Sequence, residues 1–160
     1  AAGKKVADIA EALLMEAGFE VVRTGVVRRD LGLKFPFLVT DRAVGRQWYI
    51  DVAGAFTNAR PGMRRADILW RTLGRAHVLA NGHHDDPAGR PRLLLLTPRL
   101  PRTGSEGDRA LRAGGGHGFF DALELFDEGA LARLRHYAEA SPDRPRAGFW
   151  TEDEVEARFA

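Results

Sequence analysis

The stretch that decides the fold runs from residue 34 to residue 57 and reads KFPFLVTDRAVGRQWYIDVAGAFT. Two runs rich in β-branched and aromatic residues flank a short loop that contains glycine, RAVG at residues 42–45. This pattern is typical of a β-hairpin. The second run carries one carboxylate, Asp51, among apolar residues. Because an isolated buried carboxylate is costly, we expect Asp51 to have a partner or a metal ion.

Helical and extended patterns alternate on both sides of this hairpin. Apolar residues at helical spacing predict a helix over residues 4–18, and looser alternation predicts a strand over 19–29. The expected elements after the hairpin are a helix over 65–73 ended by Gly74, strands over 76–80, 93–96 and 119–126, a helix over 128–140, and a short acidic helix with a capping box of Thr151 and Glu154. This order predicts one mixed α/β (α+β) domain over residues 1–160 with a central sheet.

The composition excludes several classes of protein. The chain of 160 residues has no cysteine, which rules out a disulfide scaffold and a thiolate zinc site. It has no apolar run long enough to cross a bilayer, and we expect a cytoplasmic protein. The formal net charge is +2, so a nucleic-acid footprint requires local clustering of basic residues. Lys34 is the only lysine beyond the N-terminal Lys4 and Lys5.

The order helix, three strands, helix, strand, with Ile50-Asp51-Val52 on the third strand, resembles the restriction-endonuclease-like PD-(D/E)xK nuclease superfamily. The likeness extends over residues 4–96. Residues 16–22, EAGFEVV, are similar to the end of the family's first helix and the start of its first strand, and residues 45–52, GRQWYIDV, to the hairpin that delivers its catalytic carboxylate. The resemblance implies a restriction-endonuclease-like core and a Mg²⁺- or Mn²⁺-dependent endonuclease that hydrolyses phosphodiester bonds in DNA, in restriction or defence.

The chain departs from the family pattern at two positions. Ala53 stands where members carry lysine, and Pro36 is followed by Phe37 where the second strand usually begins with aspartate. Two origins are open for Ala53, natural degeneration of the motif and an inactivating substitution. With residues 42–45 as the loop, Pro36 faces Asp51 and Lys34 faces Ala53, and directly opposed residues share a face of the sheet.

That register suggests a migrated lysine site. Lys34 would supply the missing ammonium, and Asp30 would supply a second carboxylate. The resemblance then implies that Asp51 and Asp30 hold Mg²⁺ while Lys34 stabilises the developing charge. The alternatives are a solvated Lys34, an Asp30 that serves a turn, and an Asp51 that bonds to a hydroxyl or an arginine.

Arginines on the second predicted helix form a second candidate site. At 100° per residue, Arg64, Arg71 and Arg75 fall within about 40° of one another. A guanidinium binds phosphate bidentately, so this stripe, with Arg60 in the preceding loop, predicts contacts with the DNA backbone. The alternative is an ordinary solvated helix face.

Three functions remain open from the sequence. The first is an active endonuclease. The second is a catalytically inactive domain of the same fold that binds DNA or a partner protein. The third is a structural subunit that forms oligomers through the apolar C-terminal strand and helix, and a homodimer is compatible with each of them.

Overall fold

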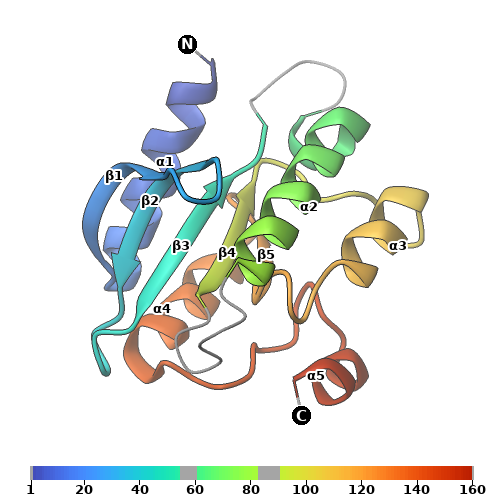
Figure 1. Ribbon diagram of the computed structural model, residues 1–160. Helices are drawn as coiled ribbons and strands as arrows, with labels where there is room; N and C mark the ends of the chain where they lie inside the picture. The colour runs from blue at the N-terminus through green and yellow to red at the C-terminus, as the bar shows by residue number, and fades with distance from the viewer. Residues whose placement is uncertain (1, 55–60, 83–90, 160) are drawn as a thin grey trace.

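The computed structural model describes residues 2–54, 61–82 and 91–159, which form a mixed sheet with helices on both faces (Figure 1). Its elements, in chain order, are α1 (Ala2–Ala17), β1 (Glu20–Arg28), β2 (Leu33–Thr40), β3 (Gln47–Val52), the 3₁₀ turn η1 (Gly62–Arg64), α2 (Ala66–Asn81), β4 (Arg92–Thr97), α3 (Glu106–Ala113), β5 (Asp121–Glu124), α4 (Ala130–Ala140) and α5 (Glu152–Arg158). No helix in these ranges has the length and apolar character needed to span a membrane.

The five strands lie side by side in chain order, from β1 to β5. β1, β2 and β3 pair antiparallel, whereas β3, β4 and β5 pair parallel. Antiparallel neighbours need only short turns, but parallel neighbours need a crossover, and α2 provides it between β3 and β4. The predicted mixed α/β class, with its order of helix, three strands, helix and strand followed by a further strand and helices, is confirmed.

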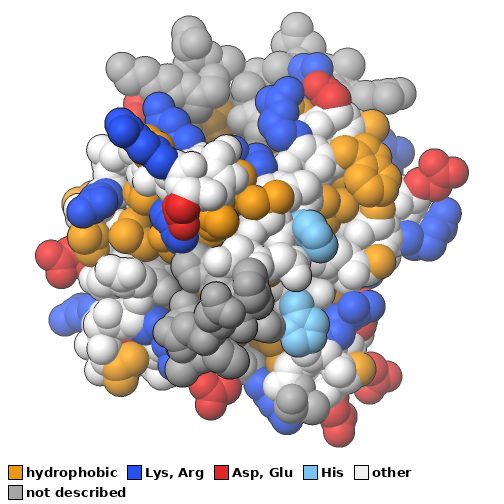
Figure 2. All heavy atoms as spheres, in the orientation of Figure 1, with side chains coloured by type: hydrophobic (Ala, Val, Ile, Leu, Met, Phe, Trp, Pro, Cys, Tyr) orange, Lys and Arg blue, Asp and Glu red, His pale blue; other side chains and the backbone are white. Residues whose placement is uncertain are grey.

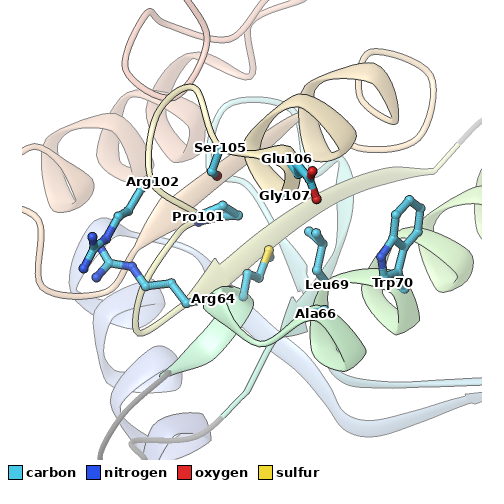
Figure 3. A pocket seen from close by; sticks show the side chains of 10 residues that line it. Arg64, Ala66, Leu69, Trp70, Pro101, Arg102, Ser105, Glu106 and Gly107 are labelled. Carbon is cyan, nitrogen blue, oxygen red and sulfur yellow. The ribbon is translucent and has the colours of Figure 1, made fainter.

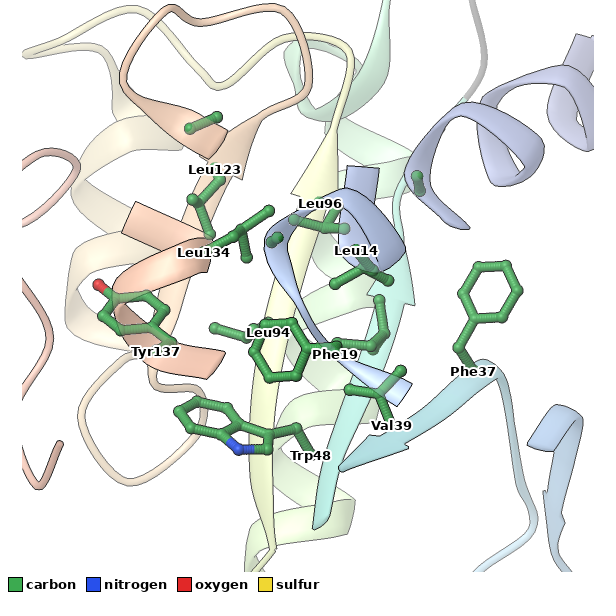
Figure 4. Close-up of a cluster of buried hydrophobic side chains, with 14 of the residues drawn as sticks. Leu14, Phe19, Phe37, Val39, Trp48, Leu94, Leu96, Leu123, Leu134 and Tyr137 are labelled. Atoms are coloured by element: carbon green, nitrogen blue, oxygen red, sulfur yellow. The ribbon is translucent and has the colours of Figure 1, made fainter. Parts of the chain in front are cut away.

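Two hydrophobic clusters lie on opposite faces of the sheet. The first packs α1 and α4 against the sheet and contains Trp48, Leu94 and Tyr137 (Figure 4). The second packs α2 and α3 against the other face and contains Tyr49 and Leu95. Because side chains alternate along a strand, β3 and β4 contribute to both clusters and are buried on both faces.

The β2–β3 hairpin has the register that its loop length predicts. Val39 lies opposite Trp48, and the Asp41 N–H donates to the carbonyl of Arg46 at 3.0 Å. The buried Asp41 carboxylate accepts hydrogen bonds from the backbone N–H groups of Val44 and Arg46 and from the Trp48 indole N–H at 3.0 Å. The loop residues and the core tryptophan therefore share one carboxylate, which fixes the hairpin.

The turn between β1 and β2 lies over the α2 face of the sheet. Arg28 donates to the Tyr49 hydroxyl at 3.2 Å, and the rings of Phe35 and Tyr49 lie 5.3 Å apart between centroids. Leu31 approaches the C-terminal end of α2 so closely that a Cβ on Gly82 would lie 2.5 Å from its Cδ2. This turn and α2 together cover the face of β3 that carries Asp51.

Two predicted boundaries are wrong for one physical reason. Gly74 does not end the second helix, and residues 76–80 belong to α2 instead of forming a strand. Buried positions continue at helical spacing along α2, at Leu69, Thr72, Ala76, Leu79 and Ala80. Gly74 lies on the exposed side, where its weak helix propensity is outweighed by packing on either side of it. Downstream, β5 is shorter than predicted, and the Thr151–Glu154 capping box is present.

Candidate functional site

Asp51 lies next to the last residue of β3 and faces α2. It is only 6 % exposed, because β2 and β4 flank its strand and α2 covers it. The strand neighbours on the same face are Tyr49 and Ala53, both buried in the α2 cluster. The Asp51 carboxylate is therefore buried among apolar residues, as predicted, and it requires a hydrogen-bonding or charged partner nearby.

That partner is Arg75 of α2. Its Nε donates to Oδ2 of Asp51 at 3.0 Å, and its Nη2 donates to the backbone carbonyl of Lys34. The guanidinium carbon also lies 4.8 Å from the centroid of the Phe35 ring. Burial raises the pKa of Asp51 more than the positive charge of Arg75 lowers it. Arg75 thus joins α2 to β2 and β3 through one planar group.

Lys34 lies beside this ion pair, and it contacts Arg75 through its backbone carbonyl. The regular β2–β3 pairing ends at Phe37 and Ile50, one residue before Pro36 would face Asp51. The Lys34 side chain is exposed, and its Cε lies 3.8 Å from where a Cβ on Gly25 of β1 would be. Its stem therefore runs over β1, on the far side of β2 from Asp51.

Asp30 is held by a different arginine. It follows β1, its side chain is 62 % exposed, and its two oxygens accept from Nε and Nη2 of Arg28 at 3.1 and 2.8 Å. Arg28 reaches the Tyr49 hydroxyl as well, which ties the turn to the sheet. Each of the two carboxylates predicted to bind metal, Asp51 and Asp30, is therefore paired with its own guanidinium.

The described residues do not fit a magnesium centre at Asp51. Mg²⁺ takes oxygen ligands in octahedral geometry and relies on free carboxylates. Asp51 and Asp30 are neutralised by Arg75 and Arg28, and within residues 2–54, 61–82 and 91–159 no group of three or more His, Asp or Glu side chains is placed to hold a metal ion.

Ala53 lies in a tightly packed junction beyond β3. It is 4 % exposed, its N–H donates to the carbonyl of Leu96, and its carbonyl accepts from the Thr97 hydroxyl at 2.9 Å. Gly54 and Gly62 have positive φ values of 87° and 60°, and a Cβ on Gly62 would lie 2.2 Å from Oγ1 of Thr97. Only glycine allows this approach, which brings the start of α2 against the ends of β3 and β4.

A small hollow opens beside the ion pair. It has a volume of about 440 Å³ and is lined by Ala7, Lys34, Phe35, Pro36, Val52, Gly54 and Arg75. Arg75 lines this hollow and Asp51 does not. A molecule that enters it therefore meets a cation before it meets the carboxylate.

The predicted arginine stripe is not a common face. Arg64 lies in η1, before α2 begins, and its Nε donates to the carbonyl of Leu100 at 3.1 Å. Arg71 is exposed on α2, whereas Arg75 points toward the sheet. Arg75 sits at the flank of the buried side of the helix, so its long side chain reaches around to Asp51. Arg60 lies outside the described residues.

Sequence reasoning missed Arg75 as the partner of Asp51 and missed the packing role of Thr97. Helical angle alone places Arg75 on the outer face of α2, whereas its side chain reaches Asp51. Two requirements taken together indicate this ion pair. The buried Asp51 needs a cation, and α2 must cover β3, the strand that carries Asp51. No model of a known protein family matches the chain, and comparisons with curated proteins and with solved structures found no match.

Proposed function

We propose that this chain is a DNA-binding domain with the architecture of the PD-(D/E)xK nucleases, in which an ion pair occupies the position of the metal centre. The observation that carries the proposal is the pairing of the buried Asp51 with Arg75 at 3.0 Å, beside Ala53 in the place of the family's lysine. The antiparallel β1–β2–β3 sheet, followed by α2 and a parallel β4, supports the likeness.

The basic surface near the start of α2 supports binding to DNA. Figure 2 shows Lys and Arg side chains over the upper part of the molecule, near the start of α2 and the upper ends of β2 and β3. Arg71 of α2 and Arg102, which lines a hollow beside the start of α2, are exposed, and Arg64 of η1 is half-buried. In the part of the chain that the structure describes, none of these three pairs with a carboxylate, so each keeps donors for a phosphate.

A metal-dependent endonuclease is the second candidate, favoured by the place of Arg75. The Arg75 side chain is 25 % exposed and lines the 440 Å³ hollow, so a DNA phosphate can compete with Asp51 for its guanidinium. In that function Asp51, released from Arg75, would be the principal ligand of Mg²⁺ or Mn²⁺, and Asp30 and Lys34 could act as second ligand and electrostatic stabiliser only after leaving Arg28 and the surface of β1.

Binding and cleavage measured on the same preparation separate these functions. Affinity for a labelled DNA duplex would be measured between low and moderate salt, and plasmid cleavage would be followed with magnesium and with manganese. We expect binding without cleavage. Metal-dependent cleavage that disappears in Asp51→Asn would overturn this proposal in favour of the endonuclease, and the absence of both binding and cleavage would remove DNA from the function.

A matched pair of triple variants tests the surface. Arg64→Gln, Arg71→Gln and Arg102→Gln together should flatten the log–log salt dependence by about 2.7, because each phosphate contact contributes about −0.9 on duplex DNA. The control replaces three exposed arginines elsewhere, at positions 42, 135 and 144, and changes the net charge equally. Equal weakening in both would indicate a general charge effect and would refute this surface as the DNA contact.

A further inference from the structure

A hollow lies between the start of α2 and the start of α3, away from Asp51 (Figure 3). Its volume is about 620 Å³, which is within the range of small-molecule sites. The side chains around it differ in kind from one end to the other. Apolar residues form the floor, an aromatic ring stands at one end, and two guanidinium groups stand at the other.

The floor is apolar and closely packed. Met63 and Leu69 are 1 % and 2 % exposed, and Pro101 lies beside them. Gly107 lets α3 come close, since a Cβ there would lie 3.3 Å from Leu69 Cδ2 and 3.3 Å from Pro101 Cβ. A flat organic ring placed over this floor would exclude water from it, which favours binding.

Trp70 stands at one end of the hollow. It is 62 % exposed, whereas the other two tryptophans, Trp48 and Trp150, are fully buried. Among the described residues, no other aromatic ring or arginine packs on the Trp70 indole. Its π-face is therefore available for stacking, and every nucleobase offers a matching face.

Arg64 and Arg102 stand at the other end, where Figure 3 shows their guanidinium groups together. The bond from Arg64 Nε to the carbonyl of Leu100 fixes that side chain and leaves its terminal nitrogens available. Within the described ranges, neither arginine forms an ion pair with a carboxylate. Two guanidinium groups at the same end of one hollow, neither paired with a carboxylate among the described residues, favour an anion that accepts several hydrogen bonds, and phosphate is such an anion.

We propose that this hollow binds one nucleotide, with its phosphate on Arg64 and Arg102 and its base on Trp70. Glu106 sets the orientation of the nucleotide, because it lines the hollow and lies nearer to Trp70 than the two guanidinium groups do (Figure 3). It repels a phosphate at that end and accepts N–H donors from a base such as guanine. The nucleotide is either free or an unpaired residue of a strand. The inference shares Arg64 and Arg102 with the proposed duplex-binding surface and does not depend on any chemistry at Asp51.

Fluorescence provides a direct test, because Trp70 is the one exposed tryptophan of three. The probe is guanosine 5′-monophosphate, compared with guanosine, with inorganic phosphate and with a short single-stranded DNA. We expect the monophosphate or the single strand to quench the emission and to bind at least 10-fold more tightly than guanosine or phosphate alone. A free-nucleotide site binds the monophosphate as tightly as the strand, and a strand site prefers the single strand. Failure of both to bind overturns the proposal.

Three kinds of variant test separately the stacking on Trp70, the positive charge of the arginines and the free space in the hollow. Trp70→Ala should weaken binding by about 5- to 150-fold, the range for loss of one base stack, while Trp70→Phe should retain most of the affinity in calorimetry. Arg102→Gln should weaken binding by about 10-fold and Arg135→Gln should not. Ala66→Phe leaves every proposed contact residue in place and fills the hollow, so it should abolish binding. Unchanged affinity in Trp70→Ala and Ala66→Phe would refute the site.

The same variants keep this inference distinct from the proposed function. Arg71→Gln should weaken duplex binding without changing nucleotide binding, because Arg71 does not line the hollow. Trp70→Ala should weaken nucleotide binding without changing duplex binding. Phe126→Ala, at a residue that is 64 % exposed on another surface, is the control for removal of an exposed aromatic side chain.

Discussion

The Nε of Arg75 donates to the Asp51 carboxylate at 3.0 Å and ties helix α2 to the middle strand of the sheet. Arg75→Leu removes the cation and leaves the carboxylate buried. We expect the free energy of unfolding to fall by about 3 kcal/mol, the lower end of the range for breaking a buried pair, since Arg75 is 25 % exposed. Chemical denaturation would measure it.

The control for this prediction is Arg71→Leu, one turn earlier on the exposed side of the same helix, which should have little effect. Adding Asp51→Asn to Arg75→Leu should recover part of the stability, because a neutral amide does not need a cation. No recovery in the double variant would mean that Arg75 stabilises α2 through the Phe35 ring and the Lys34 carbonyl alone.

Asp121 should make stability depend on pH between about 4 and 6. Burial raises the pKa of this fully buried carboxyl to about 6, although Arg133 and the Tyr137 hydroxyl oppose the rise. The folded state therefore binds a proton more readily than the unfolded state. Its contribution to the free energy of unfolding is full below pH 4 and is lost as the pH rises through 6, by about 3 kcal/mol at 1.36 kcal/mol per pKa unit.

Asp121→Asn removes this titration. The difference in unfolding free energy between wild type and variant, measured from pH 4 to pH 7, should therefore move in favour of the variant as the pH rises. Taking the difference between the two proteins at each pH cancels the contributions of the other carboxylates to the free energy of unfolding. Parallel pH curves for the two proteins would contradict the assignment.

Thr97 should be important for the junction at the ends of β3 and β4. Its hydroxyl donates to the Ala53 carbonyl at 2.9 Å and accepts from the Met63 N–H at 3.2 Å. Thr97→Val keeps the shape and leaves the Ala53 carbonyl without that donor, which should cost about 1–3 kcal/mol of stability. Thr24→Val, on the exposed edge strand β1, is the matched control and should be close to neutral. Equal unfolding midpoints for the two variants would refute the role of the hydroxyl.

Ala53→Lys, which restores the family's lysine, should destabilise the protein. Ala53 is 4 % exposed within the α2 cluster, so a lysine stem must displace packed side chains and its ammonium must lose water. We expect a loss of about 3 kcal/mol, against little change for Ala132→Lys on the surface of α4. Undiminished stability together with new cleavage activity would show that the site accepts the lysine.

Local pattern was enough to predict the hairpin and its pairing. A four-residue loop and the two-residue alternation of strands leave one register that buries both Trp48 and Val39. The need of Asp51 for a partner was predictable too, because burial of a lone carboxylate is costly in any fold. That Arg75 is this partner was not predictable, because the pairing depends on the distance between a helix and a strand in the folded protein.

Other errors arose where tertiary packing outweighed local preference. Gly74 reads as the end of a helix, yet α2 continues because Ala76 and Leu79 are buried against the sheet. The hollow beside Trp70 was not predictable, because its walls come from two segments that are distant in the sequence, residues 63–70 and 101–107. No local pattern links Trp70 to Arg102 before α2 and α3 are in place.

The Asp41 network has a consequence for the order in which the chain folds. Its carboxylate accepts from three donors that lie no more than seven residues away, so these bonds of the β2–β3 hairpin close with little loss of chain entropy. The bond from Thr97 to Ala53 joins residues 44 positions apart and must wait for α2 to return the chain. We expect pulse-labelled hydrogen exchange to protect the Trp48 indole before the amides of β4. The antiparallel half of the sheet would then be the template on which the parallel half assembles.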